Sequence, residues 1–225
     1  MTSFIAAIIA FFAAHSIPAI KPVRSALVGA MGLRGYLATY SVLSLALLAW
    51  VIWAALNAPY VELWGQPQWA WHPALLLASL GILSATFGLV RPNPLSISLN
   101  SATFDPTRPG LTAYLRHPVL TGFLLWGIGH LLINGDVVLV ALFGAMTLFA
   151  AIGPAIVNRR IIRRMGTEKR DHLIGKIANA RRTRPFLSLF GMWDIAGIVA
   201  GLAAIAALLG GLHLLLFGAD PLAGA

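Results

Sequence analysis

The sequence contains no cysteine and few charged residues. Its 225 residues include no Cys, and Asp, Glu, Lys and Arg together make up 10%. Without cysteine there is no disulfide, no thiolate nucleophile, no zinc–thiolate site and no iron–sulfur cluster. A soluble domain carries roughly 25% charged residues, and disordered chains are polar and highly charged. The scarcity of charge therefore excludes both a typical soluble domain and a disordered chain.

Long apolar runs take the place of the missing charge. The composition is 59% hydrophobic, and an apolar run of about 20 residues is long enough to cross a bilayer as a helix. We therefore predict an all-α fold, a polytopic transmembrane helical bundle of about six spans that forms a single domain over residues 1–225. The predicted spans are 3–20, 35–56, 73–89, 112–133, 137–157 and 195–217.

The basic residues gather in three connections between these spans. All 16 Lys and Arg residues lie in the segments 21–34, 91–116 and 159–184. The other connections between spans contain no Lys or Arg and carry Glu62 and Asp136. By the positive-inside rule the three basic connections face the cytoplasm. We therefore expect both termini on the outer side. The net charge of +9 then reflects membrane topology and anionic headgroups, and no nucleic-acid partner is expected.

Histidines are the ionisable residues that stand out near the spans. His15, His117, His130 and His213 lie within or beside predicted spans, and no Asp or Glu lies within any of them. Such groups are costly in a bilayer and usually face the bundle interior or a ligand. Neutral imidazole is a common ligand of haem iron, although an intramembrane His can also simply bond a neighbouring helix. The missing carboxylates argue against a carboxylate proton relay and a carboxylate-bridged di-iron site.

Short strings of polar and small residues surround these histidines. His117 and His130 are 13 positions apart, which corresponds to a rise of about 20 Å along an α-helix, so they cannot ligate one iron from a single straight helix. The strings are His-Ser-Ile-Pro at 15–18, Gly-Leu-Arg-Gly-Tyr at 32–36, Arg-His-Pro at 116–118, Trp-Gly-Ile-Gly-His-Leu at 126–131 and Asn-Gly-Asp at 134–136.

These strings resemble the NnrU family of bacterial membrane proteins over most of the chain. The family is named for a gene that is needed for nitrite and nitric oxide reductase activity. The resemblance implies a multi-pass protein of the bacterial inner (cell) membrane with an accessory or redox role in nitrogen-oxide respiration. Its partners would be membrane lipid and a membrane reductase complex.

The relatives of this family include the zeta-carotene isomerase of plants and cyanobacteria, which is a haem b protein with two histidine ligands. Carried over to this sequence, the ligands are His15 and His130, with His117 and His213 as alternatives. The predicted depths of the histidines along the spans agree better for His15 with His117, or for His130 with His213, than for His15 with His130. The relative has a Cys where this chain has Gly127, so ligand exchange with a thiolate is not expected. No catalytic residue is predicted.

Three alternative functions stay open at this point. The first is haem-dependent cis–trans isomerisation of an apolar polyene such as zeta-carotene. The second is methyl transfer, because the Arg-His-Pro string resembles isoprenylcysteine carboxyl methyltransferases, where it helps to bind S-adenosylmethionine. Those enzymes have a Glu-Glu pair eight residues before a glycine, and the corresponding positions here hold Asn158 and Arg159. The third is transport, although no broken helix at mid-membrane is predicted.

Three local structural roles are also expected. Gly197 and Gly201 form a G-x-x-x-G pair that is typical of close helix packing. Asn134 and Asp136 are expected to cap the turn between the fourth and fifth spans. The segment 158–194 is expected to hold an interfacial amphipathic helix. Its apolar side would comprise Ile161, Ile162, Met165 and Leu173.

Overall fold

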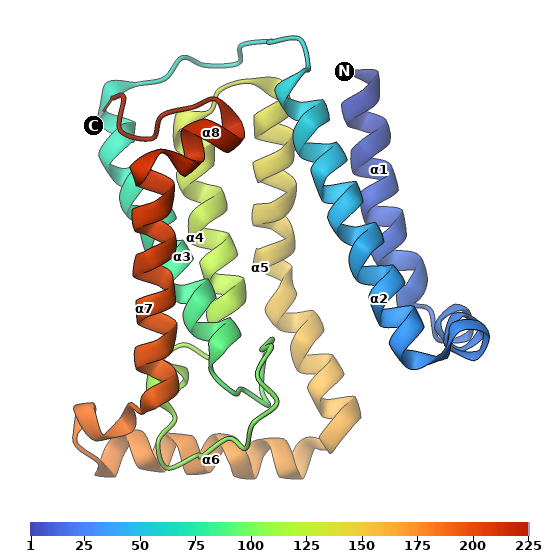
Figure 1. Ribbon diagram of the computed structural model, residues 1–225. Helices are drawn as coiled ribbons and strands as arrows, with labels where there is room; N and C mark the ends of the chain where they lie inside the picture. The colour runs from blue at the N-terminus through green and yellow to red at the C-terminus, as the bar shows by residue number, and fades with distance from the viewer. Residues whose placement is uncertain (225) are drawn as a thin grey trace. The chain divides into compact units, whose positions relative to one another are not determined.

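The computed structural model describes residues 1–224, apart from the side chain of Ala19, and these residues form helices and loops without a named strand. This confirms the predicted all-α class (Figure 1). The α-helices are α1 (Thr2–Ser16), α2 (Lys21–Leu56), α3 (Trp71–Val90), α4 (Pro118–Ile133), α5 (Val137–Met165), α6 (Thr167–Thr183), α7 (Met192–Ala207) and α8 (His213–Phe217).

Four of the described helical stretches are long and apolar enough to cross a membrane. They are α2, α3 with its preceding turn, α5, and the stretch Met192–Phe217. The apolar helices α1 and α4 have 15 and 16 residues, or about 23 Å at 1.5 Å per residue. A bilayer core is about 30 Å thick, so α1 and α4 cover part of it. The chain is therefore a helical membrane protein with four candidate spans, and the count of six stays a prediction.

Contacts divide the chain into two compact units. The first unit comprises Met1–Leu63 and Asp136–Leu142, and the second comprises Trp64–Gly135 and Phe143–Ala225.

The first unit is built around the packing of α1 on α2. Its buried core joins Phe4 and Ala7 of α1 to Val51 and Ala54 of α2. Within α2 the backbone leaves helical geometry at Gly32, where φ is 68° and ψ is 163°. A side chain strongly disfavours a positive φ, so glycine is the residue that allows this break.

Asp136 caps the start of α5, as the sequence predicts. One carboxylate oxygen accepts hydrogen bonds from the backbone N–H groups of Val138 and Leu139, both at 3.1 Å. The other oxygen accepts the N–H of Val61 at 3.0 Å. The side chain thus satisfies the free donors of the helix N-terminus and fixes the loop 57–63 against it.

The second unit packs α4 and α7 on α3 through glycines. A Cβ placed on Gly81 of α3 would lie 2.7 Å from the carbonyl oxygen of Gly122 on α4. A Cβ on Gly197 would lie 2.8 Å from Cα of Phe87, and one on Gly201 2.6 Å from Oγ1 of Thr86. These approaches confirm the predicted packing role of the G-x-x-x-G pair, because small residues let helix backbones come close in a membrane.

Replacement of Gly81 by Ala is expected to destabilise the protein by about 1–3 kcal/mol, because the new methyl group meets backbone rather than a flexible side chain. A methyl group on Gly144 of α5 would have no neighbouring atom within 4 Å, so Gly144→Ala should leave stability unchanged or raise it through helix propensity. Thermal unfolding of both variants in detergent, followed by circular dichroism, measures the difference. Equal effects at the two positions would contradict close packing at Gly81.

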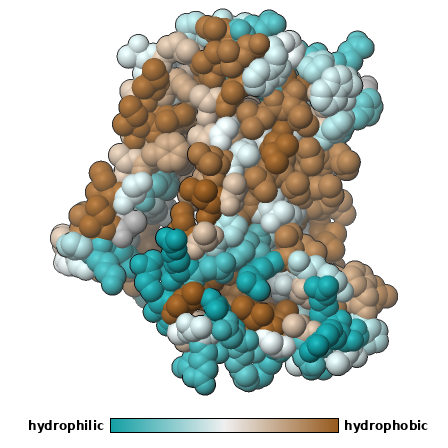
Figure 2. All heavy atoms as spheres, turned by 180° about the vertical axis from the view of Figure 1, so that it is seen from behind, coloured by the Kyte–Doolittle hydropathy of each residue, from teal (hydrophilic) through white to brown (hydrophobic). Residues whose placement is uncertain are grey.

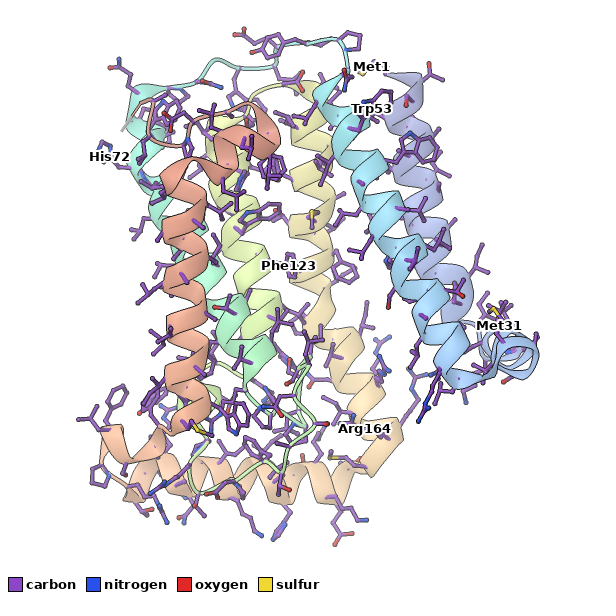
Figure 3. The ribbon with its side chains drawn as sticks, viewed as in Figure 1. Met1, Met31, Trp53, His72, Phe123 and Arg164 are labelled. Carbon is purple, nitrogen blue, oxygen red and sulfur yellow. The ribbon has the colours of Figure 1, made fainter. Side chains whose placement is uncertain are left out.

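The basic end of the second unit is formed by α6 and the loop 91–117. Helix α5 ends at Met165, Gly166 takes a φ of 82°, and α6 then runs across the ends of α3, α4 and α7 (Figure 1). Figure 2 shows hydrophilic residues gathered at this end, with apolar residues among them. In Figure 3, Arg164 lies at this end and His72 at the opposite end of the unit.

Helix α6 lies within the segment 158–194 that is expected to hold a helix, but three of the four residues predicted for its apolar side lie elsewhere. Ile161, Ile162 and Met165 belong to α5, which continues beyond the predicted span, and Leu173 lies on α6. The cause is the break at Gly166, whose positive φ ends α5 eight residues later than its apolar run. Ile161, Met165 and Leu173 still join one apolar cluster, which includes Ile177 of α6.

Candidate functional site

The structure places the four candidate histidines on different elements. His15 lies near the end of α1 in the first unit, and the other three lie in the second unit. His117 directly precedes α4, His130 lies in its last turn, and His213 begins α8. His117 and His130 are therefore at opposite ends of one helix, which confirms that they cannot share a metal.

His130 and His213 are brought together at one end of the second unit. Their ring centroids are 6.5 Å apart and their planes differ by 30°. The chain reaches this arrangement through a π-helical turn, Leu208–Leu212, in which Gly211 has a φ of 113°. That break ends the straight course of α7 and turns α8 towards the end of α4 (Figure 1).

Both imidazoles of this pair are held through Nδ1. The Nδ1 of His130 lies 2.8 Å from the carbonyl oxygen of Trp126, and that of His213 lies 2.7 Å from the carbonyl oxygen of Ala219. A carbonyl only accepts hydrogen bonds, so Nδ1 carries the proton and donates. The Nε2 of a neutral ring then keeps its lone pair, which is how metal-binding histidines are oriented by their surroundings.

Aromatic side chains surround the pair. The His130 ring lies 4.5 Å from the rings of both Trp126 and Phe143, measured between centroids. The His213 ring lies 4.9 Å from that of Phe217. Trp126 and Phe217 are each four residues from their histidine, a helical spacing that the sequence shows, whereas Phe143 comes from α5 and has no such signal.

His15 lies in an aromatic cluster of the first unit. Its Nδ1 lies 2.7 Å from the carbonyl oxygen of Phe11, so it presents the same tautomer as the pair in the second unit. The His15 ring lies 4.2 Å from that of Phe11 and 5.7 Å from that of Tyr40. His15 therefore keeps a free Nε2 lone pair and stays a candidate ligand.

His117 has a different environment at the basic end. It is buried, and its Nδ1 lies 3.0 Å from Oγ of Ser96. Its Nε2 is buried and makes no hydrogen bond in the described structure. His117 stands apart from the other candidates because a hydroxyl, rather than a carbonyl, holds its Nδ1.

A buried ion pair at the basic end is a feature that sequence reasoning missed. Arg91, at the end of α3, donates to the carboxylate of Asp194 and to the carbonyl of Arg108. The side chains are 6% and 1% exposed. Asp194 also accepts the N–H of Gly191 at 2.7 Å. The prediction that no acidic residue lies in a span needs correction, because α7 begins at Met192 and includes Asp194 in its first turn.

Within residues 1–224, no group of three or more His, Asp or Glu side chains could hold a metal ion. The candidate donors that the structure does bring together are the two rings of the His130–His213 pair.

Comparisons with known proteins identify the family. The family model described as NnrU protein matches residues 3–221, nearly the whole chain. Neither the comparison with curated proteins nor that with solved structures gave a match. The protein is therefore a member of the NnrU family.

Proposed function

We propose that this membrane protein binds haem b and has an accessory or redox role in nitrogen-oxide respiration at the bacterial inner membrane. The observation that carries the proposal is the His130–His213 pair, whose rings lie 6.5 Å apart with Nδ1 of each held by a carbonyl. Family membership supports the membrane setting.

The two rings of the pair lie close together, with centroids 6.5 Å apart. A bond from a metal to an imidazole nitrogen is about 2.0–2.1 Å long, so one metal would be within reach of both residues. Neutral imidazole is a donor that haem iron accepts.

The roles of the surrounding residues follow from their contacts. His130 and His213 would hold the group, and bound haem supplies one-electron redox chemistry. The carbonyls of Trp126 and Ala219 orient the two rings. Trp126 and Phe143 pack against the His130 ring, and Phe217 packs against the His213 ring. His15 is the other partner for His130 that the family resemblance implies.

The Gly211 break tests whether His213 is a ligand. Gly210 and Gly211 both have open space around a would-be Cβ, but only Gly211 has a positive φ. Ala at a left-handed position costs about 1–2 kcal/mol, which favours straightening of the turn that places His213. We expect Gly211→Ala to lower haem content and Gly210→Ala to leave it unchanged, as measured by the pyridine haemochrome assay. Equal haem content in both variants would favour His15 as the second ligand.

The physiological role is tested in cells. A strain without this protein should consume nitrite or nitric oxide more slowly, and the wild-type gene should restore the rate while a His130→Ala gene should not. The alternative role as a polyene isomerase predicts a changed ratio of zeta-carotene isomers in a carotenoid-producing host. An unchanged rate together with a changed isomer ratio would replace the respiratory role by isomerisation.

A further inference from the structure

A basic cavity opens between the loop 91–117 and helix α6, at the end of the second unit opposite His130. Its volume is about 570 Å³, and three arginines line it: Arg116 from the loop, and Arg181 and Arg182 from α6. No Asp or Glu of the described chain is among its lining residues. The volume is in the usual range for a small-molecule site, about 300–1,000 Å³.

The wall of this cavity is held in place by specific contacts. Arg181 donates to the carbonyl of Ala113 at 3.5 Å, and its guanidinium lies 4.8 Å from the ring centroid of Tyr114. On the loop side, Asn93 donates to the carbonyl of Arg116 at 3.2 Å and accepts the N–H of Leu95 at 2.9 Å. The contacts of Arg181 join α6 to the loop, and the hydrogen bonds of Asn93 hold the two ends of the loop together. The cavity wall is therefore fixed by specific contacts.

The charge of the cavity is not balanced by the chain. The ion pairs of the described residues are Arg91–Asp194 and Arg170–Asp171, and neither includes a cavity arginine. Asp105, an acid of the same loop, accepts the N–H and the hydroxyl of Thr107, both at 2.8 Å. These hydrogen bonds, with smaller effects of Arg184 and Arg108, lower the pKa of Asp105. Three guanidiniums around one space repel one another, and an anion between them relieves that repulsion.

The remaining surface of the cavity selects the kind of anion. Leu95, Ile174 and Ile177 give it an apolar side, and Leu95 and Ile177 belong to the apolar cluster under α6. Guanidinium forks match the oxygens of a phosphate group and bind it in a bidentate manner. An apolar wall beside them accommodates a hydrocarbon portion attached to that phosphate.

We propose that this cavity is a binding site for an anionic phosphate ester with an apolar portion, in which Arg116, Arg181 and Arg182 hold the phosphate. The headgroup of an acidic phospholipid and a soluble phosphorylated compound share this chemistry. The site goes beyond the proposed haem function, and it uses none of the residues near His130.

The test is a titration of detergent-solubilised full-length protein with three probes: short-chain phosphatidylglycerol, glycerol 3-phosphate and inorganic phosphate. Affinity is taken from the rise in unfolding temperature with ligand concentration. The cavity variant carries Arg116→Gln, Arg181→Gln and Arg182→Gln. The control variant carries Arg159→Gln, Arg160→Gln and Arg163→Gln, which removes the same charge from exposed residues on the same side of the chain that do not line the cavity.

We expect affinity to fall at least about tenfold in the cavity variant, because charge-assisted hydrogen bonds to phosphate are lost, and to change less than about twofold in the control. A preference for phosphatidylglycerol identifies a lipid, and tighter binding of glycerol 3-phosphate than of the other two probes identifies a soluble phosphate ester. Equal or tighter binding of inorganic phosphate would show that the apolar wall selects nothing, and it would overturn the proposal of an ester with an apolar portion. Equal losses in the two variants would show general attraction to negative charge and overturn the proposal. Failure of the wild-type protein to bind any probe would overturn it as well.

A conservative variant separates binding geometry from charge and from folding. Arg181→Lys keeps the positive charge but loses the planar fork. We expect its affinity for the preferred probe to fall several-fold while its unfolding temperature without ligand stays that of the wild type. Full affinity in this variant would show that the arginine forks do not hold a phosphate.

Discussion

Replacement of His130 by Ala is expected to abolish haem binding. His130 is the proposed ligand that the family resemblance and the geometry of the second unit share, so its loss would leave a haem iron with at most one protein ligand. We expect the wild-type protein to show a Soret band and the variant to be purified without one. The fold should persist, because the imidazole makes one hydrogen bond, to the carbonyl of Trp126 in its own helix.

Two further variants identify the second ligand. If His213 is the partner, His213→Ala should remove the bis-histidine spectrum and His15→Ala should leave it intact. The reverse result would assign His15. His72→Ala serves as a matched control, because His72 is an exposed residue in the first turn of α3. A His130→Ala protein that keeps the Soret band of the wild type would show that the haem is bound elsewhere.

Replacement of Asp194 by Asn is expected to destabilise the protein by about 3–5 kcal/mol, because it leaves the Arg91 guanidinium buried without a counter-charge. The Asp194 side chain is 1% exposed, so water cannot take the place of the lost carboxylate. The pair also links the end of α3 to the first turn of α7 and to the carbonyl of Arg108. Thermal unfolding in detergent measures the loss.

The exposed ion pair between Arg170 and Asp171 is a matched control for the buried one. Asp171 pairs with Arg170 at 2.7 Å, but its side chain is 55% exposed, and surface pairs contribute about 0–1 kcal/mol. Asp171→Asn should therefore change stability little. The double variant Arg91→Met, Asp194→Leu should recover part of the loss, because it removes both buried charges. Similar losses for Asp194→Asn and Asp171→Asn would contradict the structural role of the buried pair.

The positions of the apolar helices could be predicted from the sequence because each depends on a local signal. Each predicted span overlaps a helix of the structure, although α2 begins 14 residues before its predicted span and α5 ends eight residues after its own. Asp136 could be recognised as a cap because it is a short acceptor directly before an apolar run. The Gly197–Gly201 pair could be assigned to packing because small residues at that spacing form one face of a helix.

The contacts between distant elements could be predicted only in part. Equal depth in the membrane made His130 and His213 a plausible pair, but the pairing itself depends on the break at Gly211, whose positive φ has no unique sequence signal. Arg91 and Asp194 are 103 positions apart. Their opposite charges at span ends allow many pairings, and only the packing of α7 on α3 selects this one.

The absorption spectrum of the purified wild-type protein tests the central proposal most directly. The protein is expressed with ample haem supply, purified in a mild detergent, and measured oxidised and then reduced with dithionite. The proposal predicts a Soret band and sharp α and β bands after reduction, with one haem per chain. A colourless protein that is folded and monodisperse would contradict haem binding at the His130–His213 pair.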